Sequence, residues 1–254
     1  MSNIFNEYNL QQFHKDLTEF HITLSNKQVE QFITYYEMMI EKNQVMNLTA
    51  ITDFDEVLKK HFVDSLSLIK ICDLNPGYFL NYADWEFSLI DIGTGAGFPG
   101  IPLKIVFPNL QVTLMDSLNK RVEFLNDVIN TLELKGIDAI HGRAEDYAKP
   151  DRLRERYDLC VSRAVANLSV LAEYCLPYVK VGGKFISYKS EKVAEELKEA
   201  EYAIDVLGGK AESQIDFTLP DSDIYRNLVV IDKISETPRK YPRKAGMASK
   251  NPLK

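Results

Sequence analysis

The second half of the chain alternates strand-like runs with helix-like segments, and this alternation restricts the fold more than any other feature of the sequence. The apolar runs SLIDI, QVTLMD, IDAIHG, YDLCVS and GGKFISYK follow one another between Ser88 and Lys189, and segments with helical spacing, such as residues 118–134, lie among them. This alternation predicts an α/β fold, a mostly parallel sheet with helices on both faces.

The last two strand-like runs predict how the sheet ends. ESQIDFTL and RNLVVIDK are separated by residues 220–225 alone, which is too short for a crossover helix. Strands joined by so short a connection pair antiparallel. We therefore expect a doubly wound, Rossmann-like sheet with an antiparallel final strand.

The first third of the chain is predicted to be helical. Ser25 and Gln28 form a capping box, and apolar residues recur after them at helical spacing. A second helical stretch surrounds residues 57–71, and residues 73–87 look like a connection. We expect an N-terminal helical extension over residues 1–87, a Rossmann-like core over 88–237 and a C-terminal tail over 238–254.

The charges of the chain are unevenly distributed. The formal net charge is −7, yet residues 238–254 carry six cations and no acid, which leaves −13 on the remainder. A basic tail on an acidic body indicates a polyanionic partner. The residues expected to contact RNA are Arg239, Lys240, Arg243 and Lys244; the alternative is a solvated tail, or one docked on the acidic body.

Cysteine content and hydropathy predict the compartment. Cys72, Cys160 and Cys175 form no CxxC pair, which argues against a disulfide framework and against a zinc ribbon. The N-terminus shows no basic flank followed by an apolar run, and no stretch reaches the ~20 apolar residues of a membrane span. We expect a cytoplasmic protein that neither enters a membrane nor is exported.

A glycine-rich loop between the first strand and its helix is the strongest local signal. Gly93, Gly95, Gly97 and Gly100 lie within eight residues, more than a tight turn alone requires. The last three also fit the GxGxxG spacing of dinucleotide-binding proteins. Asp91, two residues before the first glycine, would repel a diphosphate but attract the sulfonium and ammonium groups of S-adenosylmethionine. The charge therefore favours S-adenosylmethionine over NAD.

Two further acids follow the next two strands. Asp116 ends the second strand, where a carboxylate can accept hydrogen bonds from ribose hydroxyls; its alternative role is to cap the following helix. Glu145 comes just after the third strand, where it could read the adenine edge, or remain a solvated loop charge. We expect both to bind the cofactor.

With these acids in order, the chain resembles class I S-adenosylmethionine-dependent methyltransferases. Further motifs resemble the bacterial 16S ribosomal RNA guanine-N7 methyltransferase family, also called glucose-inhibited division protein B, over nearly the whole chain. They are NLTAI from Asn47, HFVDSL from His61, DIGTGAGFPGIPLKI from Asp91, DSLNKRVEFL from Asp116, GRAED from Gly142, SRAVA from Ser162 and RNLVVIDKISETPRKYPRKAG from Arg226.

The resemblance implies a specific activity. It implies methylation of one guanine in the 530 loop of 16S ribosomal RNA, with the RNA or a small-subunit precursor as partner. It also implies that the cofactor is held by Gly93, Phe98, Ala144, Glu145 and Arg163. The tail departs from the family pattern at Met247-Ala248, where we would expect a proline.

Methylation of guanine N7 requires no general base, because N7 has a free lone pair and no proton. Alignment of the reacting atoms can then contribute ~7–11 kcal/mol. The four histidines show no metal or triad spacing. The sequence SRAV follows the fourth strand where amine-methylating enzymes of this fold carry (N/D)PP(Y/F). Cys160 lies in an apolar run, which favours a buried thiol over a nucleophile.

Arg163 is the expected catalytic residue. An arginine just past a strand end faces the mouth of the pocket, where it could contact cofactor, phosphate or guanine O6; the alternative is a surface salt bridge. We expect Arg163 to serve methyl transfer and not stability. His61 and Asp64 could line the RNA side or have core and capping roles.

Two other functions fit parts of the sequence. A nicotinamide-dependent oxidoreductase could use the same glycines, and a non-catalytic protein could bind S-adenosylmethionine or RNA. A cofactor titration would separate the oxidoreductase from the methyltransferase. We expect a monomer.

Overall fold

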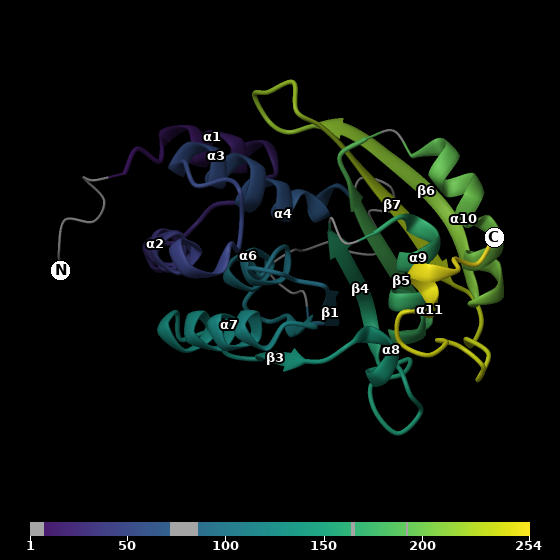
Figure 1. Cartoon of the computed structure of the whole chain (residues 1–254). Coiled ribbons are helices and arrows are strands. Elements are labelled where there is room, and N and C mark those ends of the chain that lie inside the picture. The colour runs from purple at the N-terminus through teal and green to yellow at the C-terminus, as the bar shows by residue number, and fades with distance from the viewer. Residues whose placement is uncertain (1–7, 72–85, 164–165, 192) are drawn as a thin grey trace.

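The protein is built on one seven-stranded sheet with helices on both faces (Figure 1). The computed structural model describes residues 8–71, 86–163, 166–191 and 193–254. The strand order is β3-β2-β1-β4-β5-β7-β6. The strands are β1 (Ser88–Ile92), β2 (Gln111–Asp116), β3 (Ile137–His141), β4 (Tyr157–Arg163), β5 (Val179–Lys189), β6 (Gly209–Thr218) and β7 (Tyr225–Lys233).

The directions of the strands confirm the predicted topology. β1 pairs in parallel with β2 and β4, and the pairs β2–β3 and β4–β5 are also parallel. β7 pairs antiparallel with both β5 and β6, as the short connection between the last two runs predicts. The strand order reverses between β1 and β4, and ligands of such sheets bind at the carboxyl ends of the strands beside this reversal.

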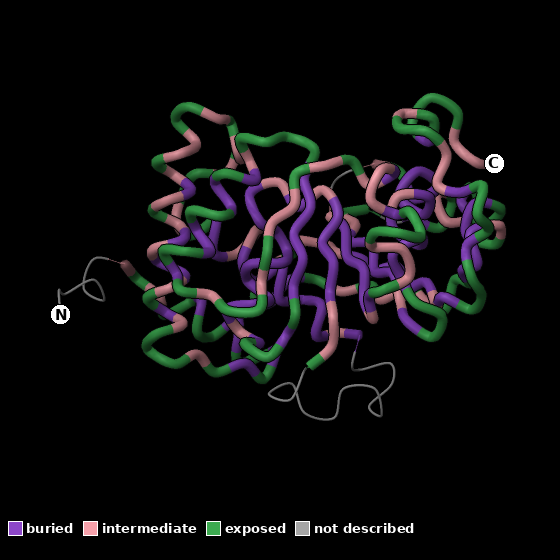
Figure 2. Tube along the Cα trace, turned by 90° about the horizontal axis from the view of Figure 1, so that it is seen from below, coloured by how far each residue is buried: buried purple, intermediate pink, exposed green. Residues whose placement is uncertain are grey.

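Both faces of the sheet are buried, which explains the nearly continuous apolar runs of the inner strands. Leu89 of β1 packs into a cluster with the N-terminal helices, and its neighbour Ile90 packs on the opposite face against α9 and α10. Figure 2 shows the buried strands inside and the exposed segments around them. The helices of this half are α6 (Gly100–Val106), α7 (Asn119–Thr131), α8 (Ala144–Tyr147), α9 (Leu168–Cys175), η5 (Leu176–Tyr178) and α10 (Ala194–Val206).

The N-terminal helices pack against the sheet and extend its core. α1 (Gln11–Glu19) and α2 (Asn26–Met46) contribute Phe13 and Phe32 to a buried cluster that includes Leu89 and Leu114 of the sheet. The predicted capping box is confirmed at the start of α2, where the Ser25 and Gln28 side chains each bond the other's backbone. Cys72 and most of the predicted connection 73–87 lie outside the described residues.

The second predicted helical stretch contains an unusual turn. It runs from α3 (Phe54–Val57) through a π-helix, η2 (Leu58–Val63), and α4 (Asp64–Leu66) to a 3₁₀ turn, η3 (Ser67–Lys70). The sequence predicts the helix but not the π turn. Turns of this kind occur frequently at functional sites.

The C-terminal tail is docked on the sheet domain. The Arg154 guanidinium donates hydrogen bonds to the backbone carbonyls of Thr237, Pro238 and Tyr241. The short helix α11 (Met247–Lys250) then packs on α9, as Figure 1 shows in yellow. The sequence leaves open whether a tail that does not bind RNA is solvated or docked on the acidic body. The backbone of the tail is docked.

Two findings concern the predicted cellular setting. Cys160 and Cys175 are free, buried thiols, which agrees with the packing role predicted for Cys160. Within the part of the chain that the structure describes, no helix has both the length and the apolar composition needed to cross a membrane.

Candidate active site

The glycine loop turns sharply at the carboxyl end of β1. Gly93, Gly95 and Gly97 have φ angles of 73°, 63° and 108°, a region that favours glycine. The backbone N–H groups of Gly93 and Thr94 donate to the Met115 carbonyl at 2.9 and 3.2 Å, which ties the loop to β2. The loop backbone is therefore fixed in place.

Asp91 holds this loop from beneath. Its Oδ2 accepts hydrogen bonds from the Thr94 hydroxyl at 2.7 Å and from the Gly100 N–H at 2.9 Å. The side chain has no exposed surface, and this burial raises the pKa of Asp91 to about 7 against the opposing effect of the two hydrogen bonds. Asp91 was predicted to meet the cofactor directly, whereas its observed contacts shape the loop.

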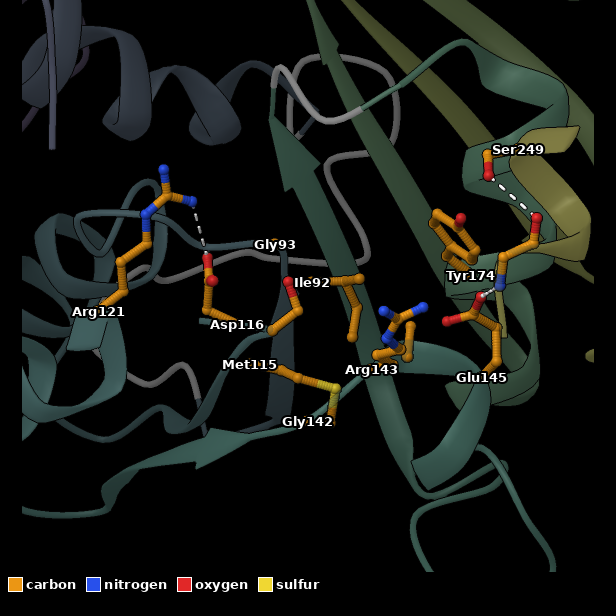
Figure 3. Close-up of a pocket in the computed structure, with 13 residues that line it drawn as sticks. Ile92, Gly93, Met115, Asp116, Arg121, Gly142, Arg143, Glu145, Tyr174 and Ser249 are labelled. Atoms are coloured by element: carbon orange, nitrogen blue, oxygen red, sulfur yellow. Dashed lines mark hydrogen bonds and ion pairs between the residues drawn. The ribbon is translucent and has the colours of Figure 1, made fainter. Parts of the chain in front are cut away.

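A cavity of about 400 Å³ opens beside the loop, at the carboxyl ends of β1, β2 and β3 (Figure 3). Of the predicted cofactor residues, it brings together Gly93, Asp116, Ala144 and Glu145. The remaining lining residues come from strand ends, α7, α9 and the tail; they are Ile92, Met115, Ser117, Arg121, Gly142, Arg143, Tyr174, Gly246 and Ser249.

Asp116 is buried and already bound at both carboxylate oxygens. Its Oδ2 accepts the Gly95 N–H at 3.0 Å and contacts Arg121 at 3.4 Å, while Oδ1 accepts the Leu118 N–H at 2.9 Å. The contact with Leu118 closes the turn before α7, whose N-cap residue is Leu118 and receives no side-chain cap, so Asp116 does not have the predicted capping role. Oδ2 already has two partners, but Oδ1 carries a second lone pair, so Asp116 can still accept a hydrogen bond from a ligand there.

The far wall of the cavity comes from the C-terminal tail. Glu145, itself buried, accepts the Gly246 N–H at 2.8 Å, and Figure 3 shows this contact beside Tyr174 and Ser249. Arg243 anchors the tail through an ion pair of 2.6 Å with Glu173, whose side chain is 1% exposed. The tail therefore forms part of this cavity, which agrees with the predicted alternative of a tail docked on the acidic body.

The cavity contains both acidic and basic side chains, together with room beside the loop backbone. The carboxylates of Asp116 and Glu145 supply acceptors, but Arg121 and Arg143 also line the cavity, so it is not uniformly acidic. A Cβ built on Gly95 would meet nothing within 4 Å, which means that the backbone there faces open space. These features fit S-adenosylmethionine, with Gly95 free to approach it.

Arg163 lies in a second cavity, of about 300 Å³, on the other side of the reversal in strand order. Its Nη1 donates to Asp64 Oδ2 at 2.8 Å and to the Lys60 carbonyl at 3.3 Å, and its Nη2 donates to His61 Nδ1 at 3.2 Å. The remaining lining residues are Ile51, Tyr188, Lys189, Ser190 and Arg226. Arg163 thus forms the salt bridge named as its alternative role, but with a buried carboxylate and at the wall of a cavity.

Phe98 connects the glycine loop to this second cavity. The Arg163 guanidinium lies 5.0 Å from the centre of the Phe98 ring, and the His61 ring stacks on it at 4.6 Å. Phe98 is 5% exposed. Two of the five residues that the resemblance assigns to the cofactor, Phe98 and Arg163, thus contact each other beside the second cavity.

His61 is held in its neutral form. Burial, followed by the charge of Arg163, lowers the pKa of His61 to about 3. Since Arg163 can only donate, Nδ1 accepts, and Nε2 must carry the proton that bonds the Thr49 hydroxyl at 2.8 Å. The ring is a fixed acceptor towards Arg163 and not an acid.

The cations predicted to contact RNA have different environments. Arg239, Lys240 and Lys244 are exposed, whereas Arg243 is committed to Glu173. The described residues contain no group of His, Cys, Asp or Glu side chains that could hold a metal ion.

Sequence reasoning missed several site residues. Arg226 is the second residue of β7, far along the chain from Arg163, and the antiparallel pairing of β7 with β5 brings the two arginines to one edge of the sheet. Tyr174 and Gly246 meet because the tail folds back over α9. The basic run after the last strand predicts RNA contact or docking on the acidic body, but it does not predict which tail residues line a cavity.

Comparisons with known proteins agree with this arrangement. Residues 28–225 match the family described as rRNA small subunit methyltransferase G. A protein named ribosomal RNA small subunit methyltransferase G from Lachnoclostridium phytofermentans is 56% identical over 241 residues, covering 95% of this chain and 96% of that protein. The protein of the same name from Staphylococcus carnosus is 51% identical over 239 residues, covering 93% and 95%.

Among solved structures, MtNAS in complex with MTA and tNA is similar with a TM-score of 0.52. It is 17% identical, and the match covers 82% of this chain and 74% of that one. This similarity concerns the fold alone. Sequence identity over nearly full length carries the assignment: the chain belongs to the rRNA small subunit methyltransferase G family.

Proposed function

We propose that the protein transfers the methyl group of S-adenosylmethionine to N7 of a guanine in the 530 loop of 16S ribosomal RNA. Family membership supports methylation of small-subunit ribosomal RNA with this cofactor. The observation that carries the site assignment is the pair of cavities, one on each side of the glycine loop.

The cavity at β1, β2 and β3 is proposed to bind the cofactor. Asp116 would accept hydrogen bonds from the ribose, and Glu145 and Ala144 would meet the adenine edge. Gly93 and Gly95 would let the backbone approach closely, while Asp91 and Phe98 would hold the loop in shape. When bound, S-adenosylmethionine supplies a methyl group activated by its sulfonium.

The protein contributes alignment and not proton transfer. N7 of guanine attacks with its own lone pair, so no residue has to remove a proton, and the neutral, fixed His61 agrees with this. Alignment of the reacting atoms can contribute ~7–11 kcal/mol to lowering the barrier. Arg163 is proposed to contact the acceptor base, which makes it the catalytic residue of this mechanism.

Methylation assays test the proposed function. Purified protein is incubated with methyl-labelled S-adenosylmethionine and either 16S ribosomal RNA or assembled small subunits, and N7-methylguanine is mapped by cleavage at the modified base. We expect one modified guanine in the 530 loop, absent from the RNA of cells that lack the gene. Methylation at another atom, or tight binding of NAD with no heat from S-adenosylmethionine, would contradict the proposal.

Two statements about the cellular form follow from this function. We propose that the protein acts in the cytoplasm, because ribosomal RNA is made and assembled there. A monomer is supported by the fact that one chain supplies the lining of both cavities. Sedimentation at micromolar concentration, with and without cofactor, should give the mass of one 29.1 kDa chain.

A further inference from the structure

A buried carboxylate joins two arginines at the second cavity. Asp64 Oδ2 accepts from Arg163 at 2.8 Å, and Asp64 Oδ1 accepts from Arg226 Nε at 2.7 Å. The side chain of Asp64 is 5% exposed, against 13% and 16% for the two arginines. The Asp64 carboxylate is therefore more deeply buried than the two guanidinium groups, which are the more exposed charges at the cavity wall.

The three charges do not balance one another. Asp64 offsets one of the two guanidinium charges, and the two lysines of this cavity have other acids: Lys60 pairs with Glu56 and Lys189 with Glu196, each at 2.6 Å. Burying such charges is costly, and it is weak evidence for stabilisation. An unbalanced ion group at the wall of a cavity instead indicates binding of an electron-rich ligand.

The contacts of Arg163 restrict how it can donate. A guanidinium has five N–H donors. In the described part of the chain, Nη1 donates to Asp64 and to the Lys60 carbonyl, and one N–H of Nη2 goes to His61. The outer Nη1/Nη2 fork, which could chelate both O6 and N7 of guanine, is thus occupied. Its Nε–H and the second N–H of Nη2 remain to donate to a ligand.

We propose that this cavity binds the acceptor guanine and that Asp64 is a positioning residue, which orients Arg163 and Arg226 towards O6. The assignment rests on the proposed function. Guanine presents two acceptors, O6 and N7, on this edge, whereas adenine presents a donor in place of O6. Arginine donors therefore select guanine and reject adenine. Single donation to O6 leaves the N7 lone pair available for the methyl group.

The acceptor base must leave its stack to enter such a cavity. Enzymes that modify bases extrude the target nucleotide into a pocket. A volume of about 300 Å³ lies at the lower end of the range for small-molecule pockets. The His61 and Phe98 rings, stacked at 4.6 Å behind Arg163, fix the guanidinium from its rear.

Substitution of Asp64 tests the positioning role. Asp64→Asn should lower kcat/KM for the RNA at least tenfold and leave the affinity for S-adenosylmethionine within twofold. Asp16→Asn is a matched control, because Asp16 is also buried and pairs with a lysine, Lys59, at 2.5 Å, but does not line the cavity. The control should lower the melting temperature without lowering kcat/KM at temperatures where it is folded.

Two further readouts separate positioning from a structural role. In RNA with 2-aminopurine at the target, which lacks O6, the wild type should methylate at least tenfold more slowly than with guanine, and Asp64→Asn should reduce this discrimination. In an Arg163→Ala background, Asp64→Asn should cost less than it does alone, since residues that act together are not additive. Wild-type discrimination in Asp64→Asn, or full additivity, would overturn the proposal.

Failure of this pocket and failure of the proposed function can be told apart. If the wild type methylates the 530 loop but Asp64→Asn does so equally well, the pocket is wrong and the function stands. If the wild type methylates no ribosomal RNA, the function is wrong. Calorimetry with guanosine and adenosine monophosphates then decides the pocket: preference for guanosine, lost in Asp64→Asn, supports it, and equal affinity overturns it.

Discussion

Single glycines of the loop have different tasks. A Cβ at Gly97 would lie 2.5 Å from Ile101 Cδ1 and 2.7 Å from the Tyr35 hydroxyl, and one at Gly100 would lie 2.3 Å from Leu114 Cδ2. Core side chains therefore leave no space for a side chain at Gly97 or Gly100. At Gly95 nothing lies within 4 Å, so its missing side chain leaves room for a ligand.

Gly95→Val should therefore abolish cofactor binding in a protein that still folds. The new side chain would enter the cofactor's space, and the φ of 63° costs only about 1–2 kcal/mol for a non-glycine residue. Calorimetry with S-adenosylmethionine should show at least a tenfold loss of affinity, with a cooperative melt. The comparison variant is Gly97→Ala, which should destabilise the fold instead. Unchanged affinity in Gly95→Val would place the cofactor elsewhere.

Two residues near Arg163 should give opposite pH dependences of stability. Burial raises the pKa of Asp91 to about 7, so the folded protein binds the extra proton between about pH 4 and 7, and the stability from Asp91 is lost as pH rises through that range. His61, with a pKa of about 3, binds its proton only when unfolded, so its contribution grows as pH rises to about 6.5.

Each effect approaches about 1.4 kcal/mol per pH unit, and between pH 4 and 6.5 they oppose each other. Replacing one of the two residues makes the pH dependence of the other visible. Relative to wild type, the unfolding free energy of Asp91→Asn should rise with pH, and that of His61→Gln should fall. Urea unfolding at pH 5, 6 and 7 measures both slopes. Parallel curves for all three proteins would show that these groups do not titrate as described.

At the scale of elements, the sequence predicts those features that depend on neighbouring residues. The strand runs, the antiparallel final pair and the capping box at Ser25 and Gln28 all follow from spacing and short connections. The π turn at Leu58–Val63 could not be predicted, because it depends on what the helix packs against. Nor could the Arg243–Glu173 pair, whose members are 70 residues apart.

The same holds for the candidate site. Gly93, Asp116, Ala144 and Glu145 were found because each follows a strand end or a family motif, and the sheet brings strand ends to one edge. Asp91 and Phe98 belong to the same motif, but their side chains support the loop. Whether a loop side chain faces the ligand or the core depends on backbone angles that the motif does not specify.

Releasing the tail should weaken cofactor binding. Glu173→Gln removes the charge that holds Arg243, and breaking a buried ion pair by changing one partner costs about 3–5 kcal/mol. We expect the segment after Arg243, which supplies Gly246, to leave α9 while Arg154 keeps the start of the tail in place, so the affinity for S-adenosylmethionine should fall at least tenfold. Lys250→Ala, at an exposed cation of the same tail, should bind normally.

Limited proteolysis provides the structural readout for this variant. Trypsin should cleave Glu173→Gln faster than wild type or Lys250→Ala at Arg239 and Lys240. If the tail of Glu173→Gln were cleaved faster but its affinity for S-adenosylmethionine were unchanged, the Gly246 wall would be dispensable for the cofactor. Equal protection of the tail would instead show that the Arg243–Glu173 pair does not hold it in place.

For the whole molecule, the distribution of charge separates the two predicted roles of the tail. Its backbone lines the cavity proposed for the cofactor, while Arg239, Lys240 and Lys244 remain exposed on an otherwise acidic protein. Deleting residues 239–254 would remove both features at once. Replacing side-chain charges keeps the wall and tests RNA contact alone.

A triple variant with glutamine at Arg239, Lys240 and Lys244 should bind RNA more weakly at all sequences. Each lost phosphate contact lowers the slope of log affinity against log salt by roughly 0.7 on a single strand, so the slope should flatten by about 2. Filter binding from 50 to 200 mM salt measures it, and cofactor affinity should not change. An unaltered slope would assign RNA capture to another surface.

The ion group of Asp64, Arg163 and Arg226 makes the N-terminal helices and the sheet depend on each other. The carboxylate comes from the N-terminal helices, and both arginines come from the sheet. A chimera that joined this sheet to the helices of another methyltransferase of the same fold would leave two cations without their anion. We therefore expect such a chimera to lose activity unless the helices it receives also bring a carboxylate to the position of Asp64.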